Sequence, residues 1–221
     1  ILSSAQQHFL GYSSIAAIEK GFKKMIQKGT AILDVGGGSL QVSLFDKDAL
    51  VTTQGLKMGS LRIRQRLQEL EKTTIHYDKL VEEFIRNDLM SFQRLYLKDK
   101  EIRNVILMGD FITDMIFQEE MEDRIITREE FMKRYEDTVG KSVDLLAQEM
   151  EIDPEYASLV VPTMVVCRNF IDIFNAESLW APGVSLLDGI AYAFAEKKKY
   201  LKSVHNSDND TLATSKNIAK S

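Results

Sequence analysis

Cysteine, proline and histidine are scarce in this sequence. Its 221 residues include one cysteine, three prolines and three histidines. A single cysteine excludes a disulfide within the chain and favours a reducing compartment, the cytoplasm. Because Cys167 lies in the apolar run from Pro162 to Phe170, we interpret it as a buried structural residue and not as a nucleophile. The histidines, His8, His76 and His205, do not have the spacing of metal ligands.

The sequence also lacks a basic excess and a long hydrophobic run. Its net charge is −5, so nothing global favours nucleic acid or an anionic membrane as a partner. No apolar run reaches the roughly 18 residues that a membrane span needs, and no signal peptide is recognisable. We therefore expect a soluble, cytoplasmic protein. Because the chain begins at Ile1, without methionine and inside an amphipathic pattern, we expect it to be a fragment of a longer protein.

The stretch from Ala31 to Phe45, AILDVGGGSLQVSLF, is the most informative part of the chain. An apolar run ends in Asp34, three glycines follow, and an alternating segment runs from Leu40 to Phe45. Alternation with period two predicts a half-buried strand, and glycines between two such segments predict a hairpin.

Two interpretations of this glycine hairpin are open. Glycine is used where the backbone needs a positive φ or where a ligand comes close, and successive exposed N–H groups suit phosphate. In this interpretation Gly36, Gly37, Gly38 and Ser39 bind phosphate, while Asp34 holds a divalent metal or orients a water. The alternative is a plain hairpin. Three glycines exceed the one or two positive-φ positions that a tight hairpin needs, which favours the phosphate loop.

The rest of the chain alternates helices with strands, which indicates an α/β fold. Ser60 is predicted to be the N-cap of a helix, and Thr127 with Glu130 is predicted to form a capping box. Arg62, the arginine nearest the preceding loop, is assigned a role in anion binding. We predict helices over residues 3–27 (interrupted near Gly11), 61–70, 76–97, 128–139, 153–174 (restarting at Pro162) and 186–201, and further strands over 49–58, 104–108 and 178–180.

Taken in order, these motifs resemble those of the Ppx/GppA family of exopolyphosphatases and guanosine pentaphosphate phosphohydrolases. DVGGGSLQV, Asp34–Val42, resembles the family's D-[IV]-G-G-G-S-T-E-[LI]. KMGSLRI, Lys57–Ile63, resembles M-G-x-V-R-L. VILMGDF, Val105–Phe111, corresponds to a strand that leads into an S-G-T loop. WAPGVSLLDGIAYAF, Trp180–Phe194, resembles S-x-x-G-L-R-x-G-V-L-Y and its helix.

The resemblance implies an actin-like, sugar-kinase or Hsp70-type (ribonuclease H-like) lobe with a mixed sheet flanked by helices. Residues 1–202 would form the second lobe of a two-lobed phosphatase, and residues 203–221 a polar linker and the start of a following helical domain. The reaction implied is hydrolysis of a phosphoanhydride in polyphosphate or a guanosine phosphate with Mg²⁺, for which Asp34 would be a ligand. The upstream lobe of the same protein is the implied partner, and a homodimer is an open alternative.

Several positions depart from the family pattern. Ser4 stands where the resemblance places the catalytic glutamate, and Gln41 stands where a glutamate ends the glycine motif. Gly109-Asp110-Phe111 replaces the S-G-T loop, and Leu187 replaces an arginine. Serine and glutamine cannot take a proton from water near neutral pH. We therefore expect impaired hydrolysis, with Asp34, Gln41 and Ser4 as the catalytic positions.

Three functions stay open from the sequence. The first is an exopolyphosphatase-like enzyme, and the second is a relative that binds polyphosphate or a guanosine phosphate without cleaving it. The third is an ATPase or kinase of the same superfamily, which the missing acids disfavour and for which the sequence shows no sign of an adenine pocket.

Overall fold

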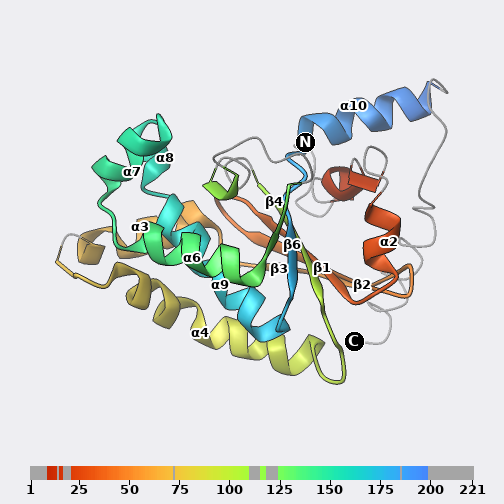
Figure 1. Cartoon of the computed structure of the whole chain (residues 1–221), viewed down its shortest axis with the longest axis horizontal. Helices are drawn as coiled ribbons and strands as arrows, with labels where there is room; N and C mark the ends of the chain where they lie inside the picture. Colours follow the sequence, from red (N-terminus) through yellow and green to blue (C-terminus); the bar gives the residue numbers. More distant parts are fainter. Residues whose placement is uncertain are drawn as a thin grey trace.

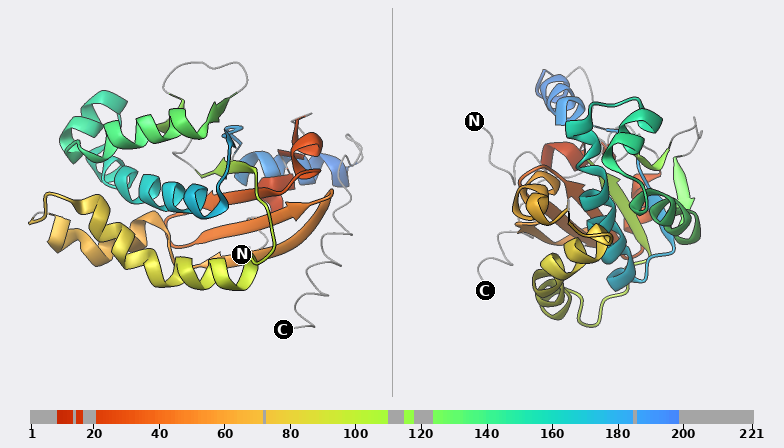
Figure 2. Two further views of the ribbon diagram at one scale, coloured as in Figure 1. Left: turned by 60° about the horizontal axis from the view of Figure 1, so that its bottom comes forward. Right: turned by 90° about the vertical axis from the view of Figure 1, so that its left-hand side faces the viewer.

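A mixed β-sheet lies between two layers of helices (Figures 1 and 2). The computed structural model describes residues 9–13, 15–16, 21–71, 73–109, 115–117, 124–184 and 186–198. Within these residues six strands follow the spatial order β3-β2-β1-β4-β6-β5. They are β1 (Thr30–Val35), β2 (Leu40–Asp46), β3 (Ala49–Leu56), β4 (Asn104–Met108), β5 (Ile125–Thr127) and β6 (Ser178–Trp180). β1, β4 and β6 are parallel, whereas β2, β3 and β5 run antiparallel to their neighbours.

One face of the sheet carries the larger apolar core. Alternate residues of the strands, such as Leu33, Val42 and Val105, pack there against α3 (Ser60–Glu71), α4 (Tyr77–Tyr96), α6 (Arg128–Val139) and α9 (Val160–Phe174). Two shorter helices, α7 (Val143–Met150) and α8 (Pro154–Ala157), lie beside this layer (Figure 1). The helix α9 is apolar on nearly all sides because it lies between the sheet and the outer helices, and Cys167 is buried in it as predicted.

The opposite face is covered by helical residues between 9 and 16 and by α2 (Phe22–Ile26), and α10 (Leu186–Lys197) approaches the first of these segments. The rings of Tyr12 and Phe22 meet the ring of Phe45 edge-to-face, with centroids 5.7 and 5.9 Å apart. Gly189 allows α10 to approach the first helical segment, because a Cβ at this position would lie 2.2 Å from the carbonyl oxygen of Leu10. Backbone contact this close requires glycine.

Most predicted elements are present, with four corrections. Gly11 lies inside helical backbone, so the predicted interruption near Gly11 is wrong, and α2 begins at Phe22 with Gly21 as its N-cap. Ser60 is the first residue of α3 and not its cap. The helix α9 restarts at Val160, so Pro162 lies in its first turn, where its missing N–H costs no intrahelical bond. β5 and α7 were not predicted, because both are short and mostly exposed.

The expectation that no segment could cross a membrane needs a qualification. Pro154–Phe174 is long and apolar enough by length and composition, but 78% of its most apolar window is buried inside this fold. The core helix of a globular protein passes the same test, so this segment is weak evidence for a membrane.

The predicted capping box opens α6 and makes one pH-dependent contribution to stability. The Glu130 carboxylate accepts bonds from the N–H (2.7 Å) and the hydroxyl (2.8 Å) of Thr127, which lower the pKa of Glu130. A depressed folded-state pKa stabilises the protein above the unfolded pKa, and this contribution is lost as the pH falls through the folded pKa. We therefore expect Glu130→Gln to flatten the loss of stability in urea between about pH 5 and 3. An unchanged pH profile would contradict this role, and Glu129→Gln serves as the matched control.

Candidate functional site

The glycine hairpin, residues Gly36–Ser39, follows the carboxyl end of β1 and leads into β2. The N–H of Gly36 donates to the carbonyl of Ser39 at 3.0 Å, and the flanking residues Val35 and Leu40 are paired in the sheet. The turn therefore stands at the edge of the sheet where the parallel strands end, the usual location of ligand sites in α/β folds.

The carbonyl groups of this hairpin are held by the start of α3. The N–H of Ser60 donates to the Gly36 carbonyl (3.2 Å), and the N–H of Arg62 donates to the Gly37 carbonyl (3.0 Å). The Nε of Arg62 donates to the Gly38 carbonyl at 2.8 Å. N–H groups at a helix start lack intrahelical partners, and here the hairpin supplies them. Arg62 thus contacts the loop, and two of the first-turn amides of α3 are already occupied.

This docking fixes the direction of the next three amide groups. The N–H and the C=O of a trans peptide point in opposite directions, and the described residues contain no cis peptide bond. Since the carbonyls of residues 36, 37 and 38 face α3, the N–H groups of Gly37, Gly38 and Ser39 point away from it. Three successive N–H groups that point in the same direction form an array of hydrogen-bond donors suited to an anion.

The glycines of the hairpin are not required by their backbone conformation. None of them has a positive φ, so the part of the prediction that invoked this conformation is wrong. A Cβ at Gly38 would meet no atom within 4 Å, and a Cβ at Gly37 would only make ordinary contact with Leu61 at 3.4 Å. Neither a positive φ nor packing within the described chain therefore requires glycine at these two positions.

Gly59 is a part of the site that the sequence analysis used only as the start of a helix. A Cβ there would lie 2.3 Å from the carbonyl oxygen of Gly37 and 2.4 Å from the backbone nitrogen of Ser39. Only a residue without a side chain allows α3 to reach the hairpin. Its position in the KMGSLRI segment was the feature of the sequence that could have assigned Gly59 to the site.

Asp34 and Gln41 are neighbours on the face of the sheet opposite to α3. Asp34 pairs with Gln41 of β2 on one side and with Met108 of β4 on the other. Gln41 also pairs with Gly55 of β3, and its carboxamide lies over that glycine, because a Cβ on Gly55 would be 3.0 Å from Nε2. The side chain of Gln41 therefore reaches toward β3, while Asp34 is the carboxylate next to the hairpin.

The remaining predicted positions are not brought together by the described structure. Ser4 and Asp110 lie outside the described residues. Gly109 directly follows β4 and has φ 136°, and Leu187 is 75% exposed on α10. In the part of the chain that is described, no three His, Cys, Asp or Glu residues group as a metal site. Mg²⁺ commonly uses one or two carboxylates plus substrate phosphates, and Asp34 is the carboxylate that lies next to the hairpin.

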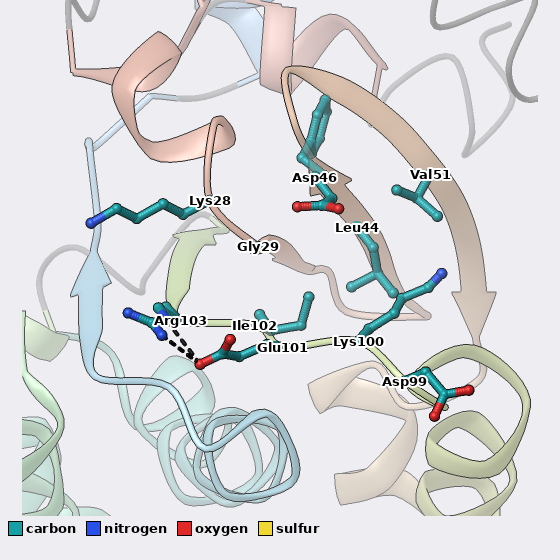
Figure 3. A pocket seen from close by; sticks show the side chains of 11 residues that line it. Lys28, Gly29, Leu44, Asp46, Val51, Asp99, Lys100, Glu101, Ile102 and Arg103 are labelled. Carbon is teal, nitrogen blue, oxygen red and sulfur yellow. Dashed lines mark hydrogen bonds and ion pairs between the residues drawn. The ribbon is translucent and has the colours of Figure 1, made fainter.

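A cavity of about 390 Å³ lies at the other end of β1 and contains none of the predicted site residues. Figure 3 shows that its charges are balanced: Arg103 pairs with Glu101, and Lys100 and Asp99 lie at the far side. The cavity is therefore not part of the hairpin site.

The sheet order, the flanking helices and the hairpin at the end of β1 define a lobe of the actin-like ATPase fold. The chain belongs to the Ppx/GppA phosphatase family, whose family model matches residues 12–198. Within that fold, the hairpin and α3 carry the DVGGGS and KMGSLRI segments.

Solved structures of this family share the fold at low sequence identity. The Aquifex aeolicus Ppx/GppA family member is 13% identical, with a TM-score of 0.64 over 89% of this chain and 64% of its own. An exopolyphosphatase from Cytophaga hutchinsonii is 15% identical, with a TM-score of 0.70 over 87% of this chain and 64% of its own. An exopolyphosphatase-like protein is 14% identical, with a TM-score of 0.70 over 89% and 68%. No curated protein matches the chain.

The close contact between Gly59 and the hairpin predicts a contrast between two glycine substitutions. Gly59→Ala should lower the free energy of unfolding by more than about 2 kcal/mol, because backbone atoms must move. Gly38→Ala should leave stability unchanged or raise it by up to about 1 kcal/mol, since its Cβ meets open space. Urea denaturation of both variants measures the difference. Equal stabilities would contradict the close packing of α3 against the hairpin.

Proposed function

We propose that this chain is the second, phosphate-binding lobe of a Ppx/GppA-type protein that holds polyphosphate or a guanosine phosphate and hydrolyses it poorly. The chain spans 64% of the length of the Aquifex aeolicus and Cytophaga hutchinsonii proteins, which supports the division into lobes. On this proposal residues 1–202 belong to the lobe, and residues 203–221 are a linker and the start of a helical domain. The upstream lobe of the same protein closes the site.

One observation carries the proposal of phosphate binding. The N–H groups of Gly37, Gly38 and Ser39 share one direction because the preceding carbonyls are bonded to α3. These bonds exist before a ligand arrives, so the donors need no reorganisation on binding. Arg62 supports the array through its bond to Gly38 and adds positive charge beside it. Gly36 is not one of these donors, because its own N–H donates to the carbonyl of Ser39.

Impaired hydrolysis is supported by the chemistry of the positions beside the hairpin. Attack of water on a phosphoanhydride needs a group that takes the proton, and this contributes about 10²–10⁴-fold. Gln41 carries an amide with no basic character in this range, and its carboxamide leans over Gly55. Ser4 has no carboxylate either. Asp34 is then the acid left to orient a water or to hold Mg²⁺ together with substrate phosphates, where the ion would neutralise charge on the phosphate oxygens.

A non-catalytic binding protein is the second candidate function, and Gln41 is the observation that favours it. In either case we propose a cytoplasmic protein that acts on phosphorylated ligands, without nucleic acid or a membrane as partner. These assignments rest on composition and family membership.

Binding at the hairpin can be tested on the chain itself. We expect inorganic triphosphate to shift the ¹H–¹⁵N resonances of Gly37, Gly38 and Ser39 saturably, because their N–H groups become donors. Gly38→Ala should weaken this binding at least tenfold, because its Cβ enters the space beside the donors. Gly140→Ala is the matched control, since its Cβ also meets open space but lies at the end of α6. Resonances that do not move would refute the donor array.

The loss of catalytic acids can be tested by restoring them in the two-lobed protein. Ser4→Glu with Gln41→Glu should increase phosphate release from long-chain polyphosphate with Mg²⁺ by about 10²-fold or more, because a general base returns. Gln27→Glu with Gln93→Glu adds the same charge at two exposed positions outside the predicted site and should not do so. Rapid hydrolysis by the unchanged protein would refute impairment, and equal rates in both double variants would refute the assignment of these positions.

A further inference from the structure

A second cavity, of about 740 Å³, lies between α2 and the edge of the sheet formed by β6 and β5. Its volume is in the range of small-molecule sites. Lys24 and Lys28 reach it from α2 and the turn after it, and Arg124 reaches it from the residue before β5. Trp180 and Ser178 of β6 also contribute to its wall.

The charge of this lining is of one sign. Its charged residues are Lys24, Lys28 and Arg124, with no carboxylate among the lining residues of the described chain. The cavity at the end of β1, by contrast, has three basic and three acidic residues in its lining. A lysine near the C-terminus of a helix is also stabilised by the helix dipole, and this explains the position of Lys24 without a ligand. It does not explain Arg124, which comes from a separate segment.

Arg124 is held in an unfavourable backbone conformation. Its φ is 48°, in the left-handed region that residues other than glycine, asparagine and aspartate rarely adopt. The N–H of Ala181 donates to its carbonyl at 3.1 Å, and its Nη1 donates to the carbonyl of Pro182 at 3.1 Å. The second bond uses one of the five guanidinium donors and fixes the side chain at the cavity. Strain of this kind is kept where the surroundings impose it, often at functional sites.

The second cavity is distinct from the glycine hairpin. Asn104, in its wall, is the first residue of β4, whereas the hairpin lies beside the last residue, Met108. Four residue steps along a strand correspond to roughly 13 Å. Figure 3 shows the Lys28 side chain, which also lines the cavity at the end of β1, extending toward β6, whose residues line the second cavity.

We propose that this cavity is a second anion site, which binds a small oligophosphate through Lys24, Lys28 and Arg124. The guanidinium fork matches phosphate oxygens, and the two ammonium groups supply further charge-assisted hydrogen bonds. Three positive charges without a carboxylate in the lining favour a ligand with at least two negative charges. The site does not depend on the proposed function of the hairpin.

Trp180 makes this proposal directly testable, because it lines the cavity and is the one tryptophan of the chain. Titration with inorganic triphosphate, at constant ionic strength set with NaCl, should change its fluorescence saturably. Lys24→Met with Lys28→Met should raise the dissociation constant at least tenfold. Lys23→Met removes an adjacent lysine that does not line the cavity and should change the constant less than twofold.

A hairpin variant separates this site from the proposed phosphate loop. Arg62→Ala should leave the Trp180 titration unchanged, whereas Gly38→Ala should affect the hairpin resonances alone. The proposal is overturned if triphosphate gives no saturable change, or if Lys23→Met weakens binding as much as the double variant. It is also overturned if Arg62→Ala abolishes the signal. Four acids precede Arg124 in the sequence, at positions 119, 120, 122 and 123 outside the described residues. If these carboxylates paired with Lys24, Lys28 and Arg124, triphosphate would give no saturable change in fluorescence, and the proposal would be overturned.

The conformation of Arg124 gives a further check. Arg124→Gly removes the guanidinium and the backbone strain together, because glycine adopts positive φ freely. We expect this variant to bind triphosphate at least tenfold more weakly and to unfold at a temperature no lower than the unchanged chain. Arg124→Lys keeps one charge and should lose less affinity. Undiminished binding by Arg124→Gly would overturn the role of this residue.

Discussion

The bonds between the glycine hairpin and the start of α3 are the interaction on which the candidate site depends. Ser60 and Arg62 donate hydrogen bonds to three successive carbonyls, those of residues 36–38. These bonds set the direction of the N–H groups of residues 37–39. Gly59 makes the contact possible by having no side chain. An N–H array does not follow from glycine content, since a glycine-rich turn without such anchors samples many conformations. The site is therefore a joint product of the hairpin and the helix.

The layers around the sheet hold this arrangement in place. The helix α9 buries apolar side chains against the sheet, and its polar edge carries a network of charges that joins three helices. Asp172 pairs with Arg128 of α6 at 2.6 Å and with Arg168 at 2.8 Å, and Arg168 also pairs with Glu82 of α4 at 3.3 Å. These pairs are partly exposed, so they orient the helices more than they stabilise them. Burial of apolar surface supplies most of the stability.

On the proposed function, phosphate binding and hydrolysis depend on different kinds of group. A phosphate cradle built from backbone N–H groups tolerates changes in side chains, because no side chain supplies the donors. Proton transfer, in contrast, depends on the identity of a few residues, and Gln41 and Ser4 have no basic group. If the proposal holds, this chain keeps the geometry of a phosphate loop although Gln41 and Ser4 carry no acid beside it.

The sequence by itself determined the α/β class, the strand at 104–108, the family and the absence of carboxylates at Gln41 and Ser4. These features follow from local pattern and residue identity. It missed β5 and α7, which are too short and exposed to give a periodic signal, and it took Ser60 for a cap because it could not see that a carbonyl from the hairpin caps α3. Only the tertiary structure decided why Gly59 is a glycine, and that Lys24, Lys28 and Arg124 meet at one cavity. Such contacts join segments from 20 to 100 residues apart, and sequence periodicity carries no information about distances of that kind.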